Sequence, residues 1–242
     1  MRWLSFSYVL FLAVAAAVST ASAQDGPDIF ITPIPNTPFS GVVNVERSVI
    51  QPNSSVLHWK TVREIRRDSH GRIHNEARAL MPASSHETPQ LLRIHLYDPQ
   101  TRVSTIIFPR EKTFRTQTLS HPPAAFPPGR RYSSTAGDGP QNDFAQQEDL
   151  GLREMEGVQV HGILETQTIP AESGANGKEI TVKDEYWYSD DLRINLLIKH
   201  DDPRTGTITM TVSKITRSEP NAAEFEIPEG YKLASAQRRT DH

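Results

Sequence analysis

The sequence contains no cysteine, which excludes disulfide bonds and metal sites built on thiolates. It also lacks the HExxH and HxH patterns of zinc sites, the GxSxG turn of serine hydrolases and the glycine-rich loops that bind phosphates. The closest histidines, His70 and His74, flank a predicted hairpin turn and would lie ~13 Å apart along an extended strand. We therefore expect no resident metal, no cofactor and no catalytic residue defined by a motif.

Concentrated charge of one sign is also missing. The 26 lysines and arginines are balanced by 29 aspartates and glutamates, for a net charge of −3. The basic residues cluster only as pairs, at 66–67, 130–131 and 238–239. Because phosphate backbones are bound by concentrated Lys and Arg, we expect no nucleic-acid partner.

A long apolar run occurs at the N-terminus. It covers 4–18, follows an arginine and precedes the small residues Ala21-Ser22-Ala23, a pattern typical of a secretory signal peptide. The run is shorter than the ~20 apolar residues of a spanning helix. We expect residues 1–23 to be a signal peptide cleaved near Ala23, with export to the periplasm or the exterior and no transmembrane span after cleavage.

Proline-rich and polar stretches divide the chain that follows the predicted signal peptide. Residues 24–39 contain four prolines and predict an extended arm, because proline is disfavoured within a sheet. Residues 120–148 combine prolines with Gly, Ser and polar residues and predict a long mobile loop, with a possible short helix at 142–148. Residues 235–242 predict a disordered tail. A single β domain is expected over 40–234.

Short segments with alternating apolar residues fill this domain, and alternation is typical of half-buried strands. Ten strands are expected, at 41–50, 56–68, 71–80, 91–99, 103–109, 112–119, 158–170, 177–189, 192–203 and 206–215. A short helix is expected near Phe225, capped by Ser218. Tight turns without helical crossovers indicate antiparallel pairing. The predicted fold class is mainly β: a strongly curved antiparallel sheet or half-barrel of about ten strands, with one or two short helices.

The stretch EYWYSDDL, residues 185–192, places three aromatic rings beside three carboxylates. Paired carboxylates with aromatic residues are typical of glycoside hydrolases, which makes glycan hydrolysis one alternative. In a regular strand, however, Tyr186 and Tyr188 face one side and Trp187 the other. Asp190 and Asp191 then mark the reversal into the next strand. A hairpin is the favoured interpretation.

Four phrases in the C-terminal half carry a resemblance: GVQVHG at 157–162, WYS at 187–189, DPR at 202–204 and FEIPEGY at 225–231. Their succession resembles that of a group of uncharacterised secreted bacterial proteins. More distantly, the layout is similar to the outer-membrane lipoprotein carrier superfamily, which includes the periplasmic lipoprotein chaperone and the sensor domain of the sigma-E regulator. The resemblance implies a half-barrel around an apolar cavity that accepts acyl chains. This chain departs from that pattern in having little predicted helix to act as a lid.

The favoured functional hypothesis is an exported, non-catalytic binding protein of the cell envelope that holds a lipid or an acylated partner on an apolar concave sheet face. The alternative is a structural or regulatory envelope protein that binds another protein. The candidate ligand-binding residues on the apolar sheet face are Trp59, Tyr186, Tyr188, Ile194 and Leu196. Leu92, Ile94 and Leu96 are expected to point inward from a further strand, although Ile94 is not assigned a place in the site.

Overall fold

A computed structural model describes residues 28–121, 145–172 and 177–234. The predicted signal peptide, the greater part of the predicted loop and the predicted tail lie outside these ranges. All that follows concerns the described residues.

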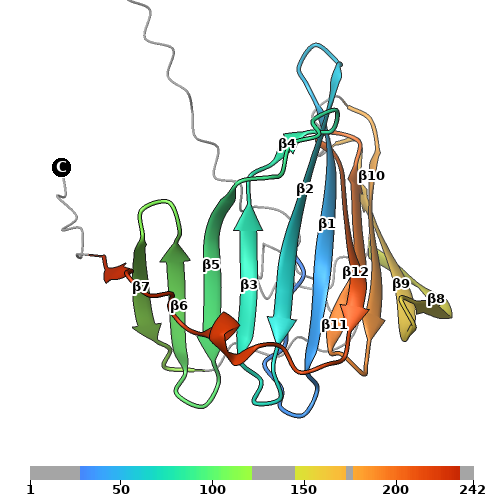
Figure 1. The fold of residues 1–242 in the computed structure, drawn as a ribbon. Helices are drawn as coiled ribbons and strands as arrows, with labels where there is room; N and C mark the ends of the chain where they lie inside the picture. The colour runs from blue at the N-terminus through green and yellow to red at the C-terminus, as the bar shows by residue number, and fades with distance from the viewer. Residues whose placement is uncertain (1–27, 122–144, 173–176, 235–242) are drawn as a thin grey trace, which may run out of the picture.

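The described chain forms one sheet of 13 strands (Figure 1). The strands are β1 (Phe39–Ile50), β2 (Val56–Arg67), β3 (Ile73–Arg78), β4 (Met81–Pro82), β5 (Leu91–Asp98), β6 (Val103–Phe108), β7 (Thr113–Thr118), β8 (Ala145–Met155), β9 (Val158–Ile169), β10 (Ile180–Ser189), β11 (Ile194–Asp202), β12 (Gly206–Thr216) and β13 (Lys232–Leu233). Their order is β13-β7-β6-β5-β3-β2-β1-β12-β11-β10-β9-β8, and β4 pairs with β2. All pairs are antiparallel except β13 with β7. The predicted fold class, a mainly β curved sheet, is confirmed.

Each of the ten predicted strands is present, and three further strands join them. β4 and β13 are two residues long, too short for a periodic pattern to mark them. The possible helix at 142–148 is wrong over its described part, because residues 145–148 begin β8. β8 pairs with β9 along its whole length, and these backbone hydrogen bonds outweigh the helical preference of a short AQQE segment.

A single turn of 3₁₀ helix, η1 (Ala222–Phe225), is the described helical element. Asn221 caps it in place of the predicted Ser218, since the Asn221 side chain accepts a hydrogen bond from Ala223 N at 3.1 Å. Phe225 is buried, as expected for an anchor on the sheet. No described helix has the length and apolar character needed to cross a bilayer.

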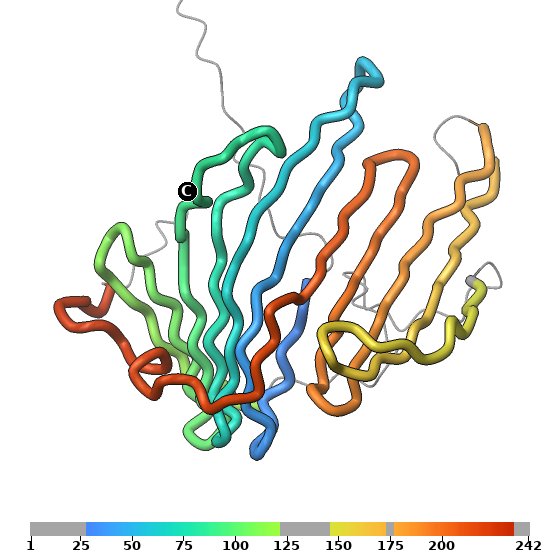
Figure 2. Tube along the Cα trace, turned by 45° about the vertical axis from the view of Figure 1, so that its right-hand side comes forward, coloured from blue at the N-terminus to red at the C-terminus, as the bar shows by residue number. Residues whose placement is uncertain are grey.

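The sheet curls along its length, so that β8 and β9 turn out of the plane of β3 and β5 (Figures 1 and 2). Register shifts within β1–β12, β3–β5, β8–β9 and β10–β11 mark bulges, which increase local twist. At one end the β8–β9 hairpin reaches β12, where the Glu156 carboxylate accepts a hydrogen bond from Lys214 N at 2.8 Å. The strand order is linear, so the described sheet is curved and open, with β13 and β8 at its two edges.

Two segments cover opposite faces of the sheet. The segment before β1, residues 28–38, lies against the face that carries Arg63 and Arg67; we call this segment the arm and this face the arm face. The C-terminal segment with η1 lies against the opposite face, where His74 Nδ1 donates to the carbonyl of Glu224 at 2.6 Å. The core combines buried residues of the arm with those of the central strands.

Candidate functional site

Arg67 holds the arm in place. Its side chain is fully buried and donates to the carbonyls of Thr32 at 2.7 Å, Thr37 at 3.0 Å and Leu192 at 2.9 Å. Burial lowers the pKa of Arg67 to about 10, which still leaves the group charged at neutral pH. One cation thus joins the arm, the end of β2 and the β10–β11 turn.

The described part of the arm extends along its face as far as Arg63. Ile29 and Ile31 are buried, and Asp28, the first described residue, forms an ion pair with Arg63. Trp59 lies four residues further along β2, or about 13 Å at the usual rise of a strand. A band of the arm face therefore extends beyond the described arm.

Strand register organises this band into rows of side chains. The first row beyond Arg63 is apolar apart from the hydroxyls of a tyrosine and a threonine. It consists of Ile163, Tyr186, Ile198, Met210, Val45 and Thr61. Tyr186, Ile198, Met210 and Val45 are buried. The hydroxyl of Thr61 is buried and has no hydrogen-bond partner within the described ranges, an unusual state for a buried polar atom.

The next row is more polar and only half-buried. It consists of Glu165, Asp184, His200, Ile208, Arg47 and Trp59, in register across six strands from β9 to β2. His200 Nδ1 lies 2.7 Å from Asp184 Oδ1, and this contact raises the pKa of His200. Arg47 makes no ion pair with any residue in the described part of the chain. The row thus carries acids at one end and an arginine beside a tryptophan at the other.

The third row lies beyond Trp59, and its β2 member is the most exposed of the three rows. Val49 and Leu57 pair directly, and the Leu57 side chain is 43% exposed. Together with Trp59 and Ile208, they form a half-buried apolar surface beside Arg47. We call Val49, Leu57, Trp59, Ile208 and Arg47 the open band.

The structure separates the predicted ligand-binding residues. Trp59 lies in the open band, while Tyr186 and Tyr188 are buried on the same face, closer to the arm. Ile194 and Leu196 are also buried, at the β10–β11 bulge, so they contribute to the core.

Ile94 lies on the opposite face from Trp59, because it pairs with Glu76 of β3 and shares the face of His74. The expectation that Leu92 points inward is wrong, since its side chain is 48% exposed beside a register shift in β3–β5. Alternation of apolar residues along one strand separates its side chains into two sets. It does not tell which set lies on the arm face when both faces of the sheet are covered.

The stretch EYWYSDDL is a hairpin with no paired carboxylates. Trp187 lies on the opposite face from Tyr186, where Arg153 stacks on its ring at 3.6 Å and its Nε1 donates to Glu185 at 2.6 Å. Asp190 and Asp191 are exposed in the turn, 3.9 Å from Arg193 Nη1 and 3.1 Å from Arg217 Nη2 respectively. Each acid therefore lies in a turn beside a basic residue. This agrees with the favoured interpretation of the stretch as a hairpin.

Asp68, His70 and Glu219 form the described cluster whose ligand atoms could surround a metal ion, within 4.8 Å of one another. Both carboxylates already have other partners. Asp68 accepts bonds from His70 N and from Arg72, and Glu219 accepts bonds from Ser69 N. The cluster therefore supports a hairpin turn and its contact with the C-terminal segment.

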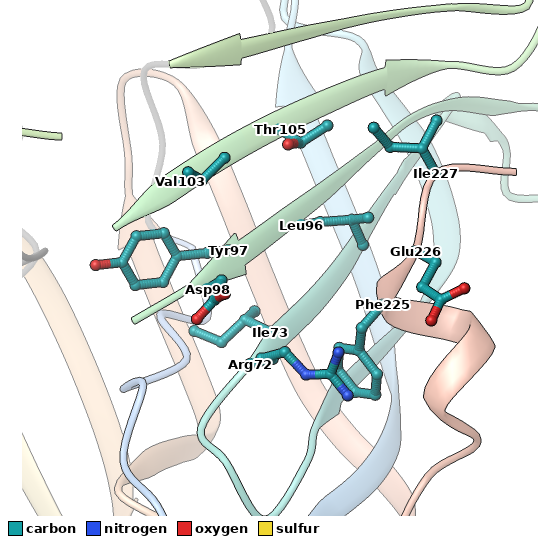
Figure 3. Close-up of a pocket in the computed structure, with 10 residues that line it drawn as sticks. All are labelled: Arg72, Ile73, Leu96, Tyr97, Asp98, Val103, Thr105, Phe225, Glu226 and Ile227. Carbon is teal, nitrogen blue, oxygen red and sulfur yellow. The ribbon is translucent and has the colours of Figure 1, made fainter. Parts of the chain in front are cut away.

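A cavity of about 260 Å³ lies on the face opposite the arm (Figure 3). It opens between the strands β5 and β6 and the segment that follows η1. Leu96 and Thr105 lie on the sheet side, facing Phe225 and Ile227. The sequence offers no periodic signal for this cavity, because the C-terminal segment has neither a helical nor a strand pattern.

A scan of protein-family models and a search of curated protein sequences each find no match. Solved structures do match. The MucA/MucB complex of Pseudomonas aeruginosa is similar at 11% identity and a TM-score of 0.38, over 79% of this chain and 56% of that chain. LppX of Mycobacterium tuberculosis is similar at 14% identity and a TM-score of 0.31, over 75% of this chain and 88% of that chain. A LolA superfamily protein of Nitrosomonas europaea is similar at 10% identity and a TM-score of 0.31, over 80% of this chain and 91% of that chain.

The resemblance to the lipoprotein carrier superfamily is distant. One of the similar solved structures is a LolA superfamily protein. The chain spans 56% of the length of the chain that it matches in the MucA/MucB complex.

Proposed function

We propose that this chain is an exported, non-catalytic binding protein of the cell envelope, and that it holds a lipid or an acylated partner on the open band of the arm face. The open band is the observation that carries the proposal. Leu57, Val49 and Ile208 offer apolar contact area next to a tryptophan, and Arg47 supplies a cation that has no partner in the described ranges. An acyl chain with a polar end matches this combination.

The described part of the arm lies apart from the open band. It fills the face between Arg67 and Arg63 with Ile29 and Ile31, whereas Leu57 and Trp59 lie further along β2. The resemblance in sequence implies the same class of ligand.

Val56 and Leu57 provide a matched test. Both are exposed, at 46% and 43%, and they are adjacent on opposite faces of β2. Leu57→Asp should weaken binding of a fluorescent C16 fatty acid at least fivefold, because a carboxylate in an acyl site loses most of the transfer free energy. Val56→Asp should leave the binding curve unchanged. Equal effects of the two changes, or no binding by the parent protein, would contradict lipid binding at this face.

Export has its own test. In a bacterial host the protein should fractionate with the envelope, and N-terminal sequencing should begin near Gln24. A full-length cytoplasmic product would contradict export and leave the binding experiment unaffected.

A second candidate function is recognition of another envelope protein through β8. Within the described sheet β8 pairs only with β9, so its outer edge is free to add a strand, and Leu152 is 66% exposed there. A photo-crosslinking residue at Leu152 should capture a defined envelope protein, whereas one at Leu233 on the other edge should not. Identical products from both positions would count against this interface.

A further inference from the structure

Arg47 is a half-buried cation whose neighbours on the arm face are uncharged. It faces Trp59 directly across β1–β2 and Ile208 directly across β1–β12. Val45 and Val49 flank it on the same face of its own strand. No described residue forms an ion pair or a hydrogen bond with Arg47. A partly buried charge is costly unless an anion pairs with it, so this position favours a ligand that supplies one.

Two acids of the arm face lie further along the rows of the open band and already have partners. In the row of Arg47, Asp184 lies three strands away, and its Oδ1 is 2.7 Å from His200 Nδ1. Strands are ~4.8 Å apart, which places Asp184 ~14 Å from Arg47 across the sheet. In the next row, Asp202 Oδ2 accepts a hydrogen bond from Arg204 Nη2 at 2.7 Å. Neither carboxylate therefore neutralises Arg47.

The apolar part of the open band has the size of one alkyl chain. Trp59 and Ile208 lie on either side of Arg47, and Leu57 and Val49 form the next row towards the β1–β2 turn. Three neighbouring strands span ~10 Å, and two successive rows on one face are ~7 Å apart. A single chain fits this area, whereas the two tails of a diacyl lipid need a wider apolar surface.

We propose that the open band is specific for a ligand with one alkyl chain and an anionic oxygen head group, either a carboxylate or a phosphate monoester. The guanidinium of Arg47 pairs with the head group, because its fork of N–H donors matches two oxygens of either anion. The chain extends from Arg47 over Trp59 and Leu57. This inference rests on the proposed function, since it names the head group of the ligand that the open band would hold.

The test compares ten-carbon probes that differ only in their head group. The full chain, labelled with ¹⁵N, is titrated near neutral pH with decanoate, decyl phosphate, decanol and decylammonium, each below its micellar concentration. At least one of the two anions should bind on the order of tenfold more tightly than decylammonium. The largest shifts should occur at the indole N–H of Trp59 and at the amides of Arg47 and Ile208. The tighter of the two anions distinguishes a carboxylate from a phosphate head group.

The outcomes separate this inference from the proposed function. Equal affinity for the anions and for decylammonium, with shifts in the open band, would overturn the head-group assignment and leave the proposed function intact. Shifts confined to residues outside the open band, or no binding of any probe, would contradict both.

Variants of Arg47 separate its charge from its packing. Arg47→Gln removes the charge and keeps part of the apolar stem. It should weaken binding of the tighter anion by roughly three- to tenfold and leave decanol binding unchanged. Arg47→Lys keeps the charge without the fork and should restore part of the affinity. An equal loss of decanol binding in Arg47→Gln would show that Arg47 acts through packing and would overturn the assignment.

Lys60→Gln is the matched control, because it removes a positive charge from the opposite face of the same hairpin. Lys60 follows Trp59 on β2 and faces Glu46 across β1–β2. The variant should bind the tighter anion as the parent does. A loss as large as that of Arg47→Gln would show a general surface charge effect and would count against a head-group site at Arg47.

Discussion

Arg67 shows how much of this fold depends on one buried polar side chain. It is fully buried, has no carboxylate partner among the described residues, and bonds three backbone carbonyls from two distant segments. Phe39 lies under its guanidinium at 4.9 Å. Sequence periodicity had placed position 67 at the end of a strand, with no sign of this role.

Arg67→Met should therefore be strongly destabilising. The change leaves three carbonyls without a donor, and each hydrogen bond to a charged group is worth about 1.5–3 kcal/mol. We expect the free energy of unfolding in urea to fall by at least about 3 kcal/mol. Arg115→Met, at an exposed arginine that stacks on Phe108 at 5.6 Å, should cost less than about 1 kcal/mol. Similar losses at both positions would contradict this role for Arg67.

Gly162 is required because the Trp187 ring occupies the place of a side chain. A Cβ at position 162 would lie 2.6 Å from Trp187 Cη2, closer than atoms can approach. Gly162→Ala should cost about 1–3 kcal/mol and shift the fluorescence of Trp187. In a double-mutant cycle, Gly162→Ala combined with Trp187→Leu should cost less than the sum of the two changes. Strict additivity would show that the ring is not the obstacle.

The Asp184–His200 pair makes stability depend on pH. The hydrogen bond to Asp184 raises the pKa of folded His200 above its ordinary value of 6.5, with Asp202 and Asp201 adding to the effect. The stabilisation is thus complete below about pH 6.5 and is lost as the pH rises through the raised pKa. The Asp184→Asn variant should be less stable than the parent at pH 6 by up to about 1 kcal/mol, with a smaller difference at pH 8.5. A difference that grows with pH would contradict this linkage.

At the scale of elements, the arm combines an irregular backbone with a buried contact surface. Its prolines keep it out of the sheet, and Ile29 and Ile31 attach it to the arm face. The described part of the arm therefore joins the face between Arg67 and Arg63 to the core.

Ile31→Ala should lower the free energy of unfolding by about 2–4 kcal/mol, the usual cost of removing a buried isoleucine. Pro35→Ala, at an exposed position of the arm, should change it by less than about 1 kcal/mol. Both values come from urea unfolding followed by circular dichroism. A negligible effect of Ile31→Ala would show that the arm contributes little to stability.

For the whole molecule, the central pairing joins β1 to β12, which are distant in sequence. Residues 40–49 pair with 206–216, and this pairing connects the β2–β7 half of the sheet to the β8–β11 half. The two halves therefore depend on a strand that comes near the end of the chain.

Truncation tests this dependence. A chain that ends at Asp202, and so lacks β12, should lose the native circular dichroism and resistance to protease. A chain that ends at Arg217 keeps all twelve strands up to β12 and should stay folded, although it lacks η1 and β13. Folding of the shorter chain would contradict a central role for β12.

Local sequence determined most of the strands. Alternation of apolar residues identified β1 and β9 to β12, and turn residues such as Asp202 and Gly206 marked their ends, because both signals arise within a few residues. The same local pattern put Tyr186 and Trp187 on opposite faces of β10. It could not foresee that both would be buried, since burial depends on what covers each face.

The tertiary structure alone decided where binding surfaces lie. Arg47, Ile208 and Trp59 come from three strands, and only the pairing of β1 with β12 and β2 brings them into one row. The same holds for Thr105 and Ile227, which line one cavity because the segment after η1 crosses the sheet. Strand character follows from each segment's own alternation, whereas a site requires contacts between segments that no local pattern encodes.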